Sequence, residues 1–313
     1  MVASLAAGFD TVANHVTIIF IPFLLDLLLW LGPHLRLKNL MQPVMDRLAT
    51  SPVPLPTSLP DIASMQQIWS DILSRFNFFQ LLRTFPLGIP SLLSSVMPTI
   101  TPLGTPPNWE ISSFSGLLGS WFVLILSGWL LGSVYFYLVS RFSIAPDPKP
   151  SLNRALLQSV LLSLTWLGLF FLAGIPILLF FSLMMLLSST LVQIGVFIFM
   201  LLAIWIILPV FFSPHGIFTY QQNAFASILQ SLRMTRFTLP TSGLFLLSSL
   251  LISEGFGYLW RIPPNNSWLT LVGIAGHAFI STGLLAASFI YYKNINAWLQ
   301  AVVEQINAKR TPV

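Results

Sequence analysis

One apolar stretch constrains this chain more than any other feature of its sequence. It runs almost unbroken from Ala155 to Phe212, over 58 residues. A helix needs about 20 apolar residues to cross a hydrocarbon core of roughly 30 Å, so the stretch is too long for one span. Two long helices fit it best, with a tight turn near Ser188 to Thr190 and a kink at Gly174 to Pro176. Three shorter spans are the alternative, but the stretch lacks a second turn signal.

The composition extends this conclusion to the whole chain. Of its 313 residues, 55% are hydrophobic and only 7% are charged, whereas soluble domains carry about 25% charged residues. These values exclude a soluble enzyme, a disordered tail and a nucleic-acid-binding domain. The 14 Lys and Arg exceed the 9 acids only slightly, and phosphate binding would need them in one basic patch. The chain has no cysteines, which suits either redox environment.

Further apolar segments bring the expected number of spans to six. The first of them contains Pro22 and Asp26 and lacks the charged start and cleavage site of a signal peptide, so we expect a retained helix. We predict an all-α fold, namely a polytopic transmembrane helical bundle with amphipathic interfacial helices, in a single integral membrane domain over residues 1–313. The expected spans are 13–32, 113–139, 156–186, 190–212, 239–259 and 268–292.

The distribution of basic residues predicts the orientation in the membrane. Lys and Arg concentrate in short cytoplasmic loops, while long loops cross regardless of their charge. With the N-terminus inside, the short outer loops hold only Arg261. We therefore expect a multi-pass protein of the cell membrane with both termini in the cytoplasm. The inner segments then hold Arg141, Lys149, Arg154, Arg233, Arg236, Lys293, Lys309 and Arg310.

Residues 33–111 form the one sizeable segment expected outside the membrane. Apolar side chains recur every three or four residues from Asp61 to Phe85, which predicts an amphipathic helix. Asp61 is its expected N-cap, and Pro86 with Gly88 marks its end. Proline-rich connectors flank the helix on both sides. Beside a membrane, such a helix either covers a cavity as a lid or shields helix ends as a structural cover.

A second amphipathic stretch, Asn223 to Phe237, precedes the fifth span on the cytoplasmic side. Arg233 and Arg236 are candidates for contact with anionic headgroups. A third amphipathic helix is expected over Met1 to Asn14. The apolar face of the second stretch is predicted to consist of Phe225, Ile228, Leu229, Leu232 and Met234.

This order of elements, with the motif Ser-Leu-Arg-Met-Thr-Arg at 231–236, resembles a known group. The chain is similar to bacterial six-helix membrane proteins of the glycerophosphodiester phosphodiesterase membrane-domain type, in their stand-alone form without a catalytic barrel. The resemblance covers about residues 110–300, and the proline-rich outer loop departs from it. It implies a bacterial protein of the cell inner membrane, close to lipid or envelope metabolism, and it implies no catalytic activity.

Ionisable side chains inside spans are costly and indicate function by default. Asp26, Glu254 and His277 lie within expected spans, and Arg261 stands at the end of the fifth. In one interpretation the four line a polar cavity, where a carboxyl exchanges a proton with His277. In the other, Glu254 pairs with Arg261, Asp26 is reached by water and His277 bonds to a neighbouring helix.

The sequence contains no recognisable catalytic or cofactor motif. Its four histidines show no spacing typical of metal ligands, and neither a phosphate-binding loop nor a nucleophile motif is present. We therefore expect no enzyme activity, no catalytic residue, no cofactor and no metal site.

Small residues at intervals of four predict close helix packing in lipid. Gly128 and Gly132 form such a pair in the second span, and Ala278, Thr282 and Ala286 form a stripe in the sixth. These faces can serve contacts within the chain or between chains.

Two functions remain open at this point. The first is a carrier or accessory factor for a lipid or other amphiphile. The alternative is a structural or assembly subunit that works through the face of Gly128 and Gly132. The expected partners are the lipid bilayer, a lipid or amphiphile, and another membrane subunit or a second copy of the chain, but no nucleic acid.

Overall fold

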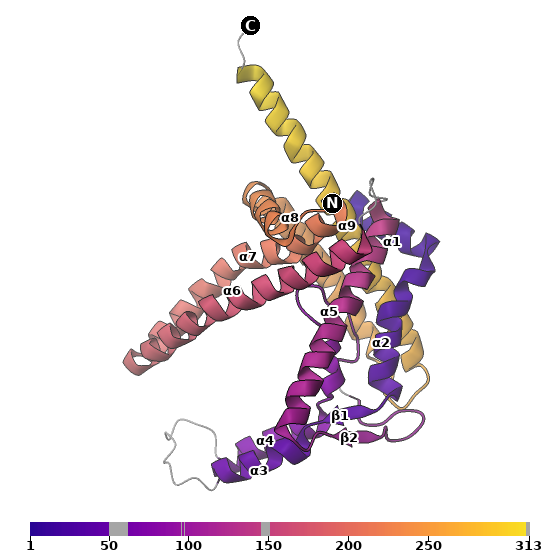
Figure 1. Ribbon diagram of the computed structural model, residues 1–313, viewed down its shortest axis with the longest axis vertical. Coiled ribbons are helices and arrows are strands. Elements are labelled where there is room, and N and C mark those ends of the chain that lie inside the picture. Colours follow the sequence, from indigo (N-terminus) through magenta and orange to yellow (C-terminus); the bar gives the residue numbers. More distant parts are fainter. Residues whose placement is uncertain (50–61, 95, 97, 145–150, 311–313) are drawn as a thin grey trace.

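The computed structural model describes residues 1–49, 62–94, 96, 98–144 and 151–310 (Figure 1). The chain is almost entirely helical, which confirms the predicted all-α class. Among the described residues, five helices are long and apolar enough to cross a membrane, and the number is six if a bent pair of shorter helices is one span. The five are α5 (Phe114–Ile144), α6 (Leu152–Leu187), α7 (Ser189–Tyr220), α8 (Ala224–Trp260) and α9 (Thr270–Arg310).

The bent pair lies at the N-terminus, where the sequence predicts an amphipathic helix over Met1 to Asn14 and a span over 13–32. Helix α1 (Val2–Asn14) corresponds to the first, and it meets η1 (Val16–Ile19) and α2 (Phe20–Leu31), which correspond to the second, at an unexpected angle of 97°. His15 has non-helical dihedral angles at the bend.

Close packing of α1 on α9 holds this bend. A Cβ atom on Gly8 would lie 2.5 Å from the Gly283 carbonyl oxygen and from the Ala287 nitrogen, so the two backbones approach as closely as only glycine allows. The ring of Phe9 lies against Gly283 and stacks on Phe279. These contacts fix the sharp bend between α1 and α2.

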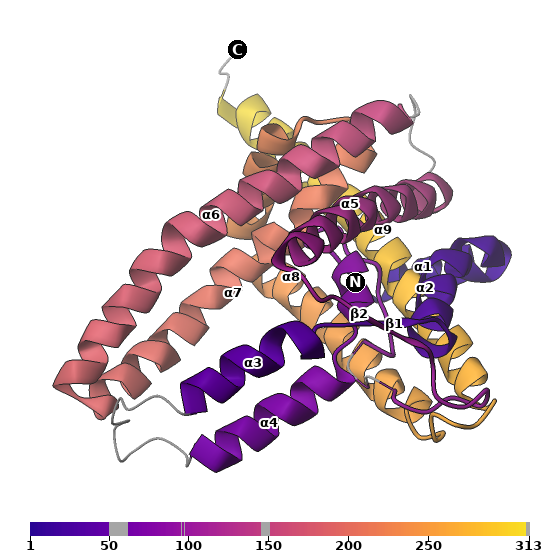
Figure 2. The ribbon, with the colours of Figure 1, turned by 60° about the horizontal axis from the view of Figure 1, so that its bottom comes forward.

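Helices α6 and α7 form a hairpin that projects away from the remaining helices, as both ribbon views show (Figure 1, Figure 2). The break between them falls at Ser188, which is extended, within the turn that the sequence predicts. Helix α6 continues through Pro176. The side chains on the far part of the hairpin are apolar and exposed, with Leu186 82% exposed. Such a surface is suited to hydrocarbon rather than to water.

Helix α8 contains a kink at Thr238, two residues before Pro240. The kink separates the amphipathic stretch from the expected fifth span. The apolar side chains of the stretch do not form one buried face: Ile228 and Met234 are buried, whereas the other three point outwards beside the two arginines. The exposed residues are Phe225, Leu229, Leu232, Arg233 and Arg236.

Residues 33–111 carry a small parallel pair of strands, β1 (His34–Arg36) and β2 (Asn108–Glu110). We call this end of the molecule the ribbon end. Two helices, α3 (Lys38–Ala49) and α4 (Ile62–Arg75), lie side by side here (Figure 2). Helix α3 was not expected from the sequence.

The predicted helix over Asp61 to Phe85 is too long. Helix α4 ends at Arg75, and a short 3-10 helix, η2 (Phe78–Leu82), follows. The break occurs at Asn77, whose side-chain oxygen accepts hydrogen bonds from the amides of Phe79 and Leu35. This capping fixes Asn77 in an extended conformation and ties it to β1. The expected cap Asp61 lies outside the described residues.

Candidate functional site

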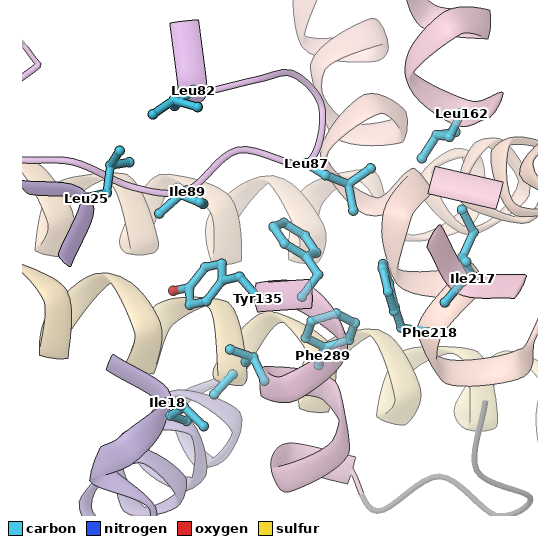
Figure 3. Close-up of a cluster of buried hydrophobic side chains, with 14 of the residues drawn as sticks. Ile18, Leu25, Leu82, Leu87, Ile89, Tyr135, Leu162, Ile217, Phe218 and Phe289 are labelled. Atoms are coloured by element: carbon cyan, nitrogen blue, oxygen red, sulfur yellow. The ribbon is translucent and has the colours of Figure 1, made fainter. Parts of the chain in front are cut away.

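A chain segment at the ribbon end crosses α5 and forms one side of the site. We call residues 82–94 the strap. Figure 3 shows three of its apolar side chains, Leu82, Leu87 and Ile89, in the buried cluster that also contains Tyr135 of α5. All three are buried in the core.

The strap packs directly on the predicted Gly128–Gly132 pair of α5. A Cβ atom on Gly128 would lie 2.6 Å from the Leu82 carbonyl oxygen, and one on Gly132 would lie 2.3 Å from the Leu87 carbonyl oxygen. The two glycines therefore allow a main-chain segment, rather than a second helix, to lie directly on α5. This packing is within the chain, and it covers the face that an assembly partner would need.

The small-residue stripe of α9 also packs inside the molecule. Ala278, Thr282 and Ala286 are fully buried. The hydroxyl groups of Thr282 and Tyr135 are 3.0 Å apart, so the stripe joins α9 to α5.

Asp26 is the anchor of the strap. Its side chain, on α2, is fully buried. The hydroxyl of Ser91 donates to Oδ1, the amide of Leu92 donates to Oδ2 at 2.9 Å, and the amide of Leu93 donates to Oδ1 at 3.2 Å. A buried carboxylate needs such donors, because burial without them is very costly. The carboxylate thereby joins the strap to the first span.

His277 of α9 lies next to this carboxylate. Its Nδ1 atom is 3.8 Å from Oδ2 of Asp26, which is longer than a hydrogen bond. Within the part of the chain that the structure describes, this Nδ1 atom has no hydrogen-bond partner. Arg83 and Arg261 are both near enough to act on the imidazole electrostatically. The structure thus brings two of the four predicted ionisable residues, Asp26 and His277, into one neighbourhood, whereas Arg261 is exposed at the end of α8.

Glu254 is not part of that neighbourhood. Its side chain is exposed on α8, and no hydrogen bond or ion pair connects it with Arg261 or with any other described residue. Its neighbour Ser253 faces the groove described below. Glu254 itself is not among the residues that line the groove.

Arg83 of the strap is a member of the site that sequence reasoning missed. Its Nη1 atom donates to Oγ of Ser94, and its Nε atom donates to the Ile89 carbonyl at 3.4 Å. Burial lowers the pKa of Arg83, whereas the Asp26 carboxylate raises it. The sequence signal that could have identified Arg83 is its position as a single basic residue in an apolar, proline-rich segment.

A lateral groove of about 1370 Å³ opens beside the strap. Its walls are the α6–α7 hairpin on one side and α5, α8 and α9 on the other, and the strap and η2 close one end. Along α7 it extends from Phe199 to His215, about 24 Å at 1.5 Å per residue. Most of the lining side chains are apolar; the polar ones include Gln80, Arg83, Tyr135, His215, Ser249 and Ser253.

His215 is a second residue that the sequence did not single out for a role. It lines the groove and is buried among aromatic rings, with Phe289 at a centroid distance of 4.5 Å. Its Nε2 atom is 2.7 Å from the hydroxyl of Ser288. A histidine on an apolar helix carries no pattern that predicts this contact.

Among the described residues, no three His, Asp or Glu side chains come together in a way that could hold a metal ion. The chemistry of the site is therefore that of a carboxylate, an imidazole and a guanidinium beside an apolar groove.

The helices and the groove define a multi-pass, all-α membrane protein. Comparisons with family models, with curated proteins and with solved structures find no match.

Proposed function

We propose that this protein binds a membrane lipid or a similar amphiphile in the lateral groove and acts as its carrier or accessory factor. The observation that carries the proposal is the groove itself. It is open to the surface between the hairpin and the other helices, and its walls are mostly apolar. Its length of about 24 Å exceeds one leaflet of a bilayer, roughly 15 Å of a 30 Å hydrocarbon core.

The surroundings of the groove support a ligand that arrives through the membrane. The hairpin that forms one wall exposes apolar side chains over much of its surface. A lipid can therefore enter sideways from the bilayer without crossing a polar barrier. We place the ribbon end outside and both termini in the cytoplasm of a bacterial inner membrane, in agreement with the basic residues of the short loops.

Asp26 and His277 have a supporting role in this proposal. Asp26 holds the strap that closes the groove, and His277 lies behind it. Movement of the strap would open this end of the groove, so the pair stands where release of a ligand would be controlled.

Native mass spectrometry of the protein released from lipid nanodiscs tests the proposal. We expect a lipid to remain bound. Ala203→Trp places a large ring on a groove-lining position of α7 and should remove most of the bound lipid. Leu186→Trp, on an exposed position of the same hairpin outside the groove, is the matched control.

Two results would contradict lipid binding in the groove. One is a wild-type protein that carries no lipid, and the other is equal lipid retention by Ala203→Trp and Leu186→Trp. A bare protein that appears as a defined oligomer or with another subunit would favour the assembly function instead.

A further inference from the structure

The charge on the lining of the groove is confined to one residue. Of the described side chains that line the groove, Arg83 alone carries a formal charge at neutral pH, and that charge is positive. Gln80, one turn before it in η2, also faces the groove, and no acidic side chain does. The end of the groove at the strap is therefore basic, while the remainder is mostly apolar.

The guanidinium group of Arg83 is held in place by two hydrogen bonds, and these bonds do not occupy all of its donors. The bonds to Ser94 and to the Ile89 carbonyl occupy Nη1 and Nε. For Nη2, the described part of the chain supplies no hydrogen-bond acceptor. The nearby Asp26 carboxylate is already satisfied by Ser91, Leu92 and Leu93. A fixed guanidinium with free donors is the side chain best suited to a phosphate group.

The position of Arg83 matches the shape of a phospholipid. A headgroup at the strap leaves the acyl chains to lie along the apolar α6–α7 hairpin, which supplies about half of the groove lining. A zwitterionic headgroup also carries a phosphate, but its ammonium group would find no carboxylate in the lining. An anionic headgroup has no such unpaired charge.

From these observations we infer that the groove selects a bilayer phospholipid with an anionic headgroup, which Arg83 binds through its phosphate. This inference rests on the proposed function, because it specifies the lipid that the groove holds.

The test uses nanodiscs made of equal parts of phosphatidylglycerol and phosphatidylcholine with identical acyl chains. Native mass spectrometry then counts each lipid on the released protein. We expect wild-type protein to retain phosphatidylglycerol about tenfold over phosphatidylcholine, as one charge-assisted contact allows. Arg83→Gln should bring the ratio close to one, and Arg83→Lys should keep most of the preference.

Two further variants separate charge recognition from folding. Arg75→Gln removes an exposed arginine of α4 that pairs with Asp71 outside the groove, and it should keep the wild-type ratio. Gln80→Glu adds a negative charge inside the groove and leaves every hydrogen bond of the strap in place. It should cancel or reverse the preference, so the inference is tested even where Arg83→Gln fails to fold.

The outcomes distinguish this inference from the proposed function. Equal retention of the two lipids by the wild-type protein would overturn the anionic preference and leave lipid binding standing. An unchanged ratio in Arg83→Gln or in Gln80→Glu would also overturn it. A wild-type protein without bound lipid would overturn both.

Discussion

The backbone amide of Leu92 donates a hydrogen bond to Oδ2 of Asp26 at 2.9 Å, although the two residues are 66 positions apart in the chain. With the bonds from Ser91 and Leu93, this contact joins the strap to α2 and leaves no lone buried charge. The most costly residue of the first span thus has a structural use, which is to hold one end of the groove in position.

Asp26→Asn should destabilise the protein by about 3 kcal/mol, because the new amide group would point N–H donors at the N–H donors of the strap. Unfolding in detergent, followed by tryptophan fluorescence, measures the loss. Glu254→Gln, on an exposed position, should stay within about 0.5 kcal/mol of wild type. Equal stability of the two variants would show that the strap does not depend on Asp26.

Gly132→Ala should loosen the strap. Its Cβ atom would lie 2.3 Å from the Leu87 carbonyl oxygen, and neither backbone can move without separating α5 from the strap. We expect a loss of about 1–3 kcal/mol and faster proteolysis within residues 82–94.

The control substitution for this prediction should not destabilise the protein. Gly119 lies on the same helix with nothing within 4 Å of its Cβ position. Gly119→Ala should therefore be neutral or stabilising by up to about 1 kcal/mol, because alanine favours the helix. Equal stability of Gly132→Ala and Gly119→Ala would contradict the close contact between Gly132 and the strap.

Gly8→Ala should detach α1 from α9, because its Cβ atom would lie 2.5 Å from the backbone of Gly283 and Ala287. The chain has no cysteine, so Ser4→Cys gives a single thiol on a buried position of α1. We expect maleimide to label this thiol several-fold faster in the presence of Gly8→Ala. Gly168→Ala, which has open space at its Cβ position, should leave the labelling rate unchanged.

The ribbon end should lose folding stability as the pH falls. Burial and the neighbouring Arg36 lower the pKa of His34 below its ordinary value of 6.5. Its Nδ1 atom accepts a hydrogen bond from Nη2 of Arg36 at 3.3 Å, which requires this nitrogen to be unprotonated. The folded state then binds fewer protons than the unfolded state, so the contribution of His34 is complete above pH 6.5 and is lost as the pH falls below it.

Thermal unfolding between pH 7.5 and pH 5.5 measures this effect. His34→Gln removes the titrating group and should flatten the fall in the unfolding midpoint over that range. The difference between wild type and His34→Gln in the slope of the unfolding midpoint against pH measures the contribution of His34. Identical slopes would contradict the prediction.

Hydropathy alone predicts the long helices and the turn at Ser188, because a membrane span is defined by its own residues. The kink at Thr238 was not expected, although its cause is local, since it lies two residues before Pro240. The long helices and the turn follow from the sequence because lipid selects for apolar length and the backbone bonds are satisfied within each helix.

Features that depend on distant contacts could not be predicted. The bend at His15 is held by α9, and the break at Asn77 depends on a hydrogen bond from Leu35. The partners of Asp26 are two backbone amides and a serine in a loop, which no residue pattern marks. Periodicity places Gly128 and Gly132 on one face of a helix, but it does not say that a main-chain segment lies there.

The strap is attached to α5 through main-chain carbonyl groups, and its groove-facing side chains Phe85 and Pro86, like Gln80 of η2, take no part in that attachment. Substitutions at these three positions can change the chemistry of the groove while the two glycines keep the frame intact. The backbone contacts that hold the strap are thus separate from the side chains that give this wall of the groove its chemistry.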